Sequence, residues 1–141
     1  MSPADPCSFC AIAGGEGAAH VVLDDERFVA FLDVRPLFPG HALLIPREHH
    51  QTLADLPGGL IGPMFERAQR LSVAVRDAAG AQGSFVALNN VVSQSVPHLH
   101  VHVVPRVKGD GLRGFFWPRT KYGADAEAAA MAARVRAELE R

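Results

Sequence analysis

Three histidines alternate with apolar residues between Val96 and Val104. Side chains of a β-strand alternate between its faces, so His98, His100 and His102 would share one face and the intervening Leu and Val residues the other. In a helix, a two-residue step of roughly 200° would turn His100 away from its neighbours. The β-branched valines and the flanking prolines also favour a strand. The pattern therefore predicts a strand over residues 96–104, with imidazoles on one face and core side chains on the other.

Three imidazoles on one face have three readings. The first is a solvated face that is rich in histidine by chance. The second is an open metal site with three histidine ligands, since imidazole is a common metal ligand. The third is chemistry on phosphate, because a neutral imidazole can attack phosphorus while its neighbours donate to phosphate oxygens. Same-face neighbours lie about 6.5–7 Å apart along a strand, which suits a polyphosphate at least as well as one ion.

The rest of the chain predicts an α+β fold with a mainly antiparallel sheet of about five strands, one long central helix and a C-terminal helix. Turn-forming residues separate the strands, and apolar residues at helical spacing mark the helices. We expect a single domain over 1–141, with a core at about 5–106, a basic aromatic loop at 106–120 and a C-terminal helix at about 125–140. The expected strands are 21–23, 28–34, 41–45, 84–89 and 96–104, and the expected central helix is 63–79.

Charge and hydropathy exclude several classes of protein. The chain of 141 residues has 14 Lys and Arg against 15 Asp and Glu, a net charge of −1, which argues against a nucleic-acid-coating protein. Its longest uncharged apolar stretches fall short of a membrane span, and its start lacks a basic region and a long apolar run. We expect a cytoplasmic protein with no nucleic-acid or membrane partner.

The two cysteines are spaced as Cys7-x-x-Cys10. A thioredoxin-like redox pair would follow a strand and open a helix, and nothing before Cys7 can form that strand. Two free buried thiols are a second reading. A zinc site is the third, and it requires two more ligands, typically histidines.

The histidine segment resembles the signature of the histidine triad (HIT) superfamily, in which three histidines alternate with apolar residues. The resemblance extends over about residues 5–106, with the motifs in the family's order. It rests on Ser8-Phe9-Cys10, Phe31-Leu32-Asp33-Val34, the stretch Pro39-Gly40-His41-Ala42-Leu43-Leu44-Ile45-Pro46-Arg47-Glu48-His49, Gln94-Ser95-Val96 before the histidines and Pro105-Arg106 after them.

This resemblance implies a HIT-like fold, a homodimer whose two sheets join, and cleavage of purine nucleotide derivatives at the α-phosphate through a nucleotidyl-histidine intermediate. His100 would be the nucleophile, with its other ring nitrogen fixed by the main-chain carbonyl of His98. His102 would bind the phosphate and, in its protonated form, stabilise charge in the transition state. Gln94 and Ser95 would contact the phosphate and the leaving group.

The resemblance also implies the remaining site residues. Asp33 would hold the ribose hydroxyls, and Asn89 would contact the phosphate. Four apolar residues would either build the base pocket or simply pack in the core: Phe9, Ile12, Leu32 and Val34. No organic cofactor is expected.

Bacterial relatives imply a structural zinc at Cys7, Cys10, His49 and His98, with His50 as a fallback ligand. Such a closed four-ligand site is structural, not catalytic.

Two segments depart from the family pattern. The turn at residues 89–94 is short and lacks glycine, which makes positive φ costly there, and Gly17 stands where relatives have a bulkier residue. The basic loop after Pro105 carries Phe115, Phe116 and Trp117. These aromatics would either pack in the core or a dimer interface, or form a flap over the active site, where the loop's basic residues would meet distal phosphates.

The leading hypothesis is a nucleotidyl-transfer hydrolase acting on a nucleoside phosphoramidate or a dinucleoside polyphosphate. A dinucleoside polyphosphate phosphorylase is the close variant. A nucleotide-binding or sensing protein with little turnover is the rival from another class. An open tri-histidine metalloenzyme is the third alternative.

Overall fold

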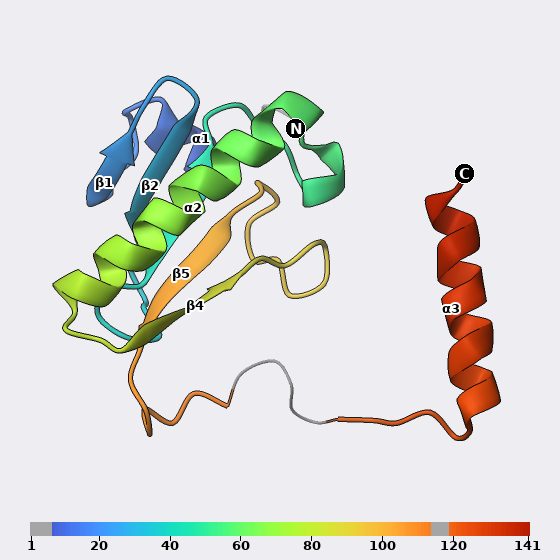
Figure 1. Ribbon diagram of the computed structural model, residues 1–141. Coiled ribbons are helices and arrows are strands. Elements are labelled where there is room, and N and C mark those ends of the chain that lie inside the picture. Colours follow the sequence, from blue (N-terminus) through green and yellow to red (C-terminus); the bar gives the residue numbers. More distant parts are fainter. Residues whose placement is uncertain (1–6, 114–118) are drawn as a thin grey trace. The chain divides into compact units, whose positions relative to one another are not determined.

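The computed structural model describes residues 7–113 and 119–141 (Figure 1). The chain forms two compact units, one ending at Asp110 and the other beginning at Gly111, and each is described by itself. The single domain over 1–141 therefore stays a prediction. Within the described residues, no helix is long and apolar enough to cross a membrane.

The first unit is built on one antiparallel sheet of five strands. The strands lie in the order β1-β2-β3-β5-β4, and every neighbouring pair is antiparallel. This arrangement confirms the predicted α+β class. The strands are β1 (Val21–Asp24), β2 (Phe28–Leu32), β3 (Ala42–Pro46), β4 (Gly83–Ala87) and β5 (Val101–Arg106).

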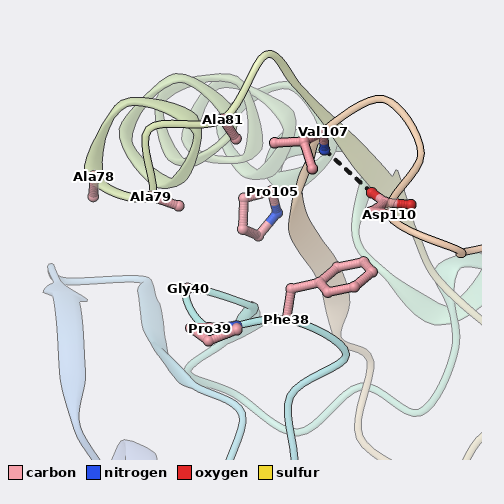
Figure 2. Close-up of a pocket in the computed structure, with 9 residues that line it drawn as sticks. All are labelled: Phe38, Pro39, Gly40, Ala78, Ala79, Ala81, Pro105, Val107 and Asp110. Carbon is pink, nitrogen blue, oxygen red and sulfur yellow. Dashed lines mark hydrogen bonds between the residues drawn. The ribbon is translucent and has the colours of Figure 1, made fainter.

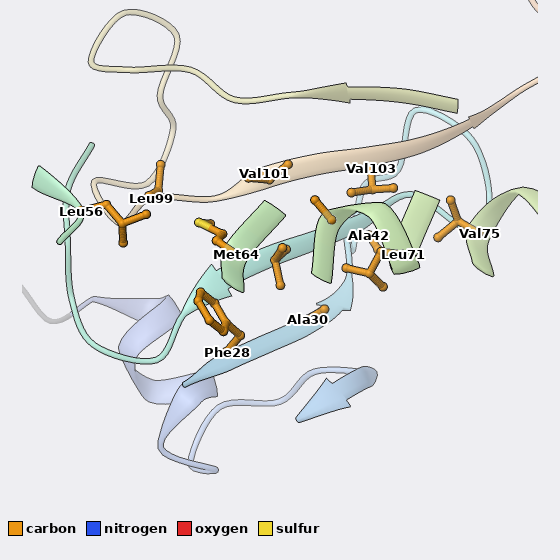
Figure 3. Close-up of a cluster of buried hydrophobic side chains, with 12 residues drawn as sticks. Phe28, Ala30, Ala42, Leu56, Met64, Leu71, Val75, Leu99, Val101 and Val103 are labelled. Carbon is orange, nitrogen blue, oxygen red and sulfur yellow. The ribbon is translucent and has the colours of Figure 1, made fainter. Parts of the chain in front are cut away.

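Alternate residues of β2 divide the core between the two faces of the sheet. Phe28 and Ala30 join the cluster under the long helix α2 (Gly58–Ala78) (Figure 3). Val29 and Phe31 join the cluster under the short helix α1 (Ser8–Ala13). All four side chains are buried, because helices cover both faces of this strand. The sheet is therefore the middle layer of three.

Helix α2 begins at Gly58, five residues before the predicted start at Pro63. Gly58 and Gly59 disfavour a helix locally, so the sequence pattern did not indicate this first turn. Pro63 lies inside the helix close to its start, so the helix lacks one main-chain hydrogen bond there. Met64, at 0% exposure, anchors the helix on the sheet, so tertiary packing outweighs local propensity.

Strand β5 pairs only from Val101, not from Val96 as predicted. The predicted alternation of faces holds even so. Leu99, Val101 and Val103 all lie in the cluster under α2, although Leu99 precedes the paired residues (Figure 3). The backbone before Val101 instead hydrogen-bonds to a loop, where the Leu99 N–H donates to the His50 carbonyl at 2.7 Å. This departure from the sheet frees the first histidines for other contacts.

The second unit contains helix α3 (Asp125–Leu139), which agrees with the predicted C-terminal helix. None of its residues is buried. The prediction for Phe115, Phe116 and Trp117 falls outside the described residues.

Candidate active site and metal centre

His100 has one ring nitrogen committed to the main chain. Its Nδ1 lies 2.7 Å from the carbonyl oxygen of His98. A carbonyl can only accept, so Nδ1 carries the proton and Nε2 of the neutral ring keeps its lone pair. His100 is 3% exposed and lines a pocket, so this lone pair is held in place and nearly desolvated. This is the tautomer that nucleophilic attack requires.

His102 receives the opposite tautomer through His41. The Leu37 N–H donates to Nδ1 of His41 at 3.0 Å, so the proton of neutral His41 is on Nε2. That nitrogen donates to Nδ1 of His102 at 2.9 Å, which leaves the His102 proton on Nε2. His102 also lines the pocket, and its ring centroid lies 5.0 Å from that of His100. The pocket thus has a nitrogen lone pair beside an N–H donor.

His102 is neutral at pH 7, contrary to the expectation of a protonated ring. Burial lowers its pKa to about 4, and the neighbouring His100 and His41 act in the same direction. Burial also lowers the pKa of His41, which Asp33 only partly opposes. His102 therefore presents a neutral N–H donor to the pocket and not a preformed cation.

The pocket beside these rings has a volume of about 310 Å³ and is mostly apolar. The edge of the Phe9 ring meets His100 with centroids 5.1 Å apart and planes at 90°. Eight of the predicted site residues line it: Phe9, Ile12, Leu32, Asp33, Val34, Ser95, His100 and His102. Helix α1, the end of β2 and the start of β5 thus converge on one hollow.

Asp33 supplies the carboxylate of this pocket, just after β2 ends. Its Oδ1 accepts the Arg35 N–H at 2.9 Å, and its Oδ2 lies 3.6 Å from Nε2 of His41. The side chain is 21% exposed, so it can still accept hydrogen bonds from a ligand.

Gln94 and Asn89 do not line this pocket, although both were predicted to contact the phosphate. Gln94 accepts the Val91 N–H at 2.9 Å and donates to the Gln51 carbonyl at 2.6 Å. Asn89 donates to the Ser93 carbonyl at 3.2 Å. Both amides therefore hold the turn between β4 and β5.

That turn adopts positive φ without glycine. Val91 has φ 69° and Ser93 has φ 64°, in the left-handed region that a β-branched residue rarely occupies. The cost expected from a glycine-free turn is therefore present, and the amide hydrogen bonds offset it.

The pocket also has residues that the sequence reasoning missed. Phe31 follows the alternation of β2 and could have been assigned to this face, whereas Arg35 and Leu43 carry no such signal. The missed residues are Ser8, Ala18, Ala19, Phe31, Arg35, Leu43 and Val96. Glycine at position 17 leaves room for Ile12 in the pocket wall, since a Cβ there would lie 2.8 Å from Cγ1 of Ile12.

Cys7, Cys10, His49 and His98 form a separate cluster whose ligand atoms all lie within 4.8 Å of one another. Nδ1 of His98 lies 3.4 Å from Sγ of Cys7 and 3.5 Å from Sγ of Cys10. Nδ1 of His49 lies 3.3 Å from Sγ of Cys10. In a tetrahedral zinc site with ordinary bond lengths, sulfur and nitrogen ligands are about 3.5 Å apart. The four residues therefore fit a zinc ion.

The surroundings of His98 prepare it as a ligand. Its Nε2 donates to the Pro46 carbonyl at 2.8 Å, which leaves a lone pair on Nδ1 toward the thiols. His98 therefore contributes its ring to this cluster and only its main-chain carbonyl to His100. The three triad imidazoles do not converge on one point, which excludes the open tri-histidine metal site. His50, the fallback ligand, lies outside the cluster, with Nε2 at 3.8 Å from Glu48.

A second group of possible ligands is Asp33, His41 and His102. There the hydrogen bond between the two imidazoles already pairs their facing nitrogens. We read this group as part of the hydrogen-bonded site.

A larger pocket, of about 410 Å³, lacks the histidine side chains that line the smaller one (Figure 2). It lies between the loop at Phe38–Gly40, the end of α2 and the residues after Val104. Its one charged lining residue, Asp110, accepts from Arg106 at 2.8 Å and from the Val107 N–H at 3.2 Å. No imidazole or thiol lines it, so the smaller pocket is the candidate active site.

Comparison with known proteins agrees with this fold and histidine arrangement. Residues 15–109 match the HIT domain, and the chain belongs to that family. An uncharacterized HIT-like protein of Mycobacterium tuberculosis is 38% identical over 109 residues, 76% of each chain. The adenosine 5'-monophosphoramidase HNT1 of Saccharomyces cerevisiae is 32% identical over 79% of this chain and 70% of its own. A zinc-bound histidine triad family protein from Mycobacterium smegmatis has a similar structure, with a TM-score of 0.72, 35% identity and 95% coverage of each chain.

Proposed function

We propose that this protein is a nucleotide hydrolase or nucleotidyl transferase that acts at the α-phosphate through a nucleotidyl-His100 intermediate. One observation carries the proposal. His100 is held with a lone pair on Nε2, and the neighbouring His102 is held with a proton on Nε2. The centroids of the two rings lie 5.0 Å apart. Opposite tautomers on adjacent rings suit an attack on phosphorus with a hydrogen bond to a phosphate oxygen.

The reaction divides into two displacements. Nε2 of His100 forms a bond to the α-phosphorus, and the bond from phosphorus to the leaving group breaks. The leaving group departs as an amine or a phosphate after it takes up a proton. Water then attacks the same phosphorus, releases the nucleotide and loses a proton, and His100 is restored. A covalent intermediate replaces one difficult step with two easier ones.

The apolar hollow beside these rings suits a nucleoside. Phe9 and Ile12 from α1, with Leu32 and Val34 near the end of β2, offer an apolar lining for a purine base. Asp33 offers a carboxylate to the ribose hydroxyls. Ser95 is the polar residue best located to meet the phosphate or leaving group, because Gln94 is engaged by the turn.

The yeast relative's name favours a nucleoside phosphoramidate as the substrate class. A dinucleoside polyphosphate is the alternative, with either water or phosphate as the acceptor. Kinetic constants for both substrate classes, each with and without added phosphate, distinguish these reactions. The P–N substrate is expected to give the higher kcat/KM, and a strong phosphate dependence would indicate a phosphorylase.

We also propose that zinc occupies the Cys7, Cys10, His49 and His98 cluster and has a structural role. The donor set and its spacing support zinc, as does the zinc-bound relative. When bound, the ion would supply cross-linking between the α1 segment and the residues before β5.

Binding with little turnover is the rival function, and the engaged Gln94 side chain is the observation that favours it. Calorimetry with AMP alongside a turnover assay separates the two. Cleavage of at least one substrate class is expected. Tight AMP binding without cleavage of any substrate would instead establish a sensor.

A further inference from the structure

The metal cluster and the candidate active site share one residue. The ring of His98 points Nδ1 at both thiols, while its main-chain carbonyl accepts from Nδ1 of His100 at 2.7 Å. His98 is 0% exposed, and its Nε2 is fixed by the Pro46 carbonyl at 2.8 Å. Because the ring is held at both nitrogens, it restrains the backbone of His98, whose carbonyl determines the tautomer and direction of His100.

The thiols lie at either end of the first turn of α1, which forms one wall of the pocket. Cys7 caps this helix, and its Sγ accepts the Cys10 N–H at 3.4 Å. Phe9, between the two cysteines, presents its ring to His98 at 6.1 Å and to His100 at 5.1 Å between centroids. A helix of six residues has little stability of its own, so its position depends on these tertiary contacts.

His49 connects the cluster to the strained turn. The residues directly after it make three hydrogen bonds to the segment that leads into β5. The His50 carbonyl accepts from Leu99 at 2.7 Å. The Gln51 carbonyl accepts from Gln94 at 2.6 Å, and the Leu53 N–H donates to Asn90 at 2.9 Å. These bonds hold a turn with two non-glycine residues at positive φ, a conformation that persists only where its surroundings fix it.

We propose that the Cys7, Cys10, His49 and His98 cluster is a positioning centre for the nucleophile, so that a metal bound there controls turnover without touching the substrate. Three connections carry this control: the His98 carbonyl, helix α1 and the turn held by residues 50–53. The kinetic part of the proposal rests on the proposed function, whereas the positioning of His100 does not.

Two histidines provide a matched pair of variants. His49→Gln removes a ligand, and His20→Gln changes an exposed imidazole that lies outside both the cluster and the pocket. Each variant is purified with zinc and compared with the wild type in metal content, kcat, KM and the imidazole ¹H–¹⁵N spectrum. His49→Gln is expected to lose metal, to lower kcat at least about tenfold, and to lose the single Nδ1–H tautomer of His100. His20→Gln is expected to keep all these properties within about twofold.

Metal exchange separates positioning from catalysis by the metal. Protein loaded with Co²⁺ or Cd²⁺ should have a kcat within about threefold of the zinc form, because a tetrahedral clamp and not Lewis acidity is required. A much larger dependence on the metal would overturn the proposal. So would a His49→Gln protein that lacks metal yet retains the wild-type kcat and His100 spectrum.

Two further measurements keep the result decisive. If His49→Gln does not fold, stepwise chelation of the wild type under native conditions, followed by the same spectra, replaces it. An unchanged His100 tautomer after metal removal would refute the proposal. If no nucleotide is turned over, the proposed function fails, and the His100 spectrum still decides the positioning role.

Discussion

Nε2 of His41 lies 2.9 Å from Nδ1 of His102, and this hydrogen bond determines which nitrogen of His102 carries the proton. The Leu37 N–H fixes His41 from its other side at 3.0 Å. A main-chain group thus selects the tautomer of a pocket residue through an intervening imidazole. His41 acts through His102 and is a positioning residue.

Removal of His41 should therefore lower kcat more than it changes KM. For His41→Ala we expect a kcat about 10–100-fold below wild type, as is usual when a residue that orients a site histidine is lost. His41→Gln retains a side-chain N–H and should recover part of this loss. Imidazole ¹⁵N shifts report the His102 tautomer directly. An unchanged kcat and tautomer in His41→Ala would show that the hydrogen bond has no such role.

The low pKa of His102 predicts a pH-dependent stability. Its pKa is about 4 in the folded chain and 6.5 in an unfolded one, so the unfolded state binds more protons between these values. Stability therefore falls as the pH drops from about 6.5 toward 4. His41, His100 and Asp33 face this ring, and burial contributes most.

Urea denaturation at pH 6.5 and 4.5 tests this effect in the wild type and in His102→Gln. The variant should lose on the order of 1–2 kcal/mol less over this interval, a value reduced for the partial exposure of the ring. Equal losses in the two proteins would mean that His102 does not titrate in this range on unfolding.

Asp33 should determine recognition of the ribose. Its carboxylate accepts charge-assisted hydrogen bonds, and their weakening in Asp33→Asn should raise KM for a ribonucleotide about tenfold. A substrate without ribose hydroxyls should be bound almost equally by both proteins. Equal losses for the two substrates would instead place Asp33 in a purely structural role through Arg35 and His41.

The sheet has two edge strands, and we predict that β4 forms the expected homodimer. Strand β1 has a register shift between Val21 and Leu23, which blunts an edge, whereas β4 pairs in regular register along all five residues. Val86 on β4 is 40% exposed and Val22 on β1 is 53% exposed. Val86→Lys should shift sedimentation toward the monomer, while Val22→Lys should not. Dimer loss only in Val22→Lys would assign the interface to the other edge.

Local patterns predicted most of the fold. The period-two alternation around His100 correctly placed Leu99, Val101 and Val103 together in the core under α2, because side-chain direction follows from the backbone repeat. The starts of α2 and β5 were misplaced by five residues each, since packing onto the sheet and a hydrogen bond to the His50 carbonyl decide them. Neither contact has a local signature.

The residues of the candidate site were also predictable only in part. The pocket and the metal cluster contain residues that the resemblance implied, each identifiable by type and spacing. The contacts of Gln94 were not predictable, because its partner Gln51 lies 43 residues away in the sequence. The neutral state of His102 was missed because it depends on burial in three dimensions.

The most direct test of the central claim is the mass of the intact protein from a quenched turnover mixture. A mixture with an adenosine phosphoramidate should contain a fraction heavier by one adenylyl group. This adduct should be absent in His100→Ala and present in His20→Ala, which changes an exposed histidine outside the site. Turnover at the wild-type rate in His100→Ala, with no adduct in any protein, would contradict a nucleotidyl-histidine mechanism.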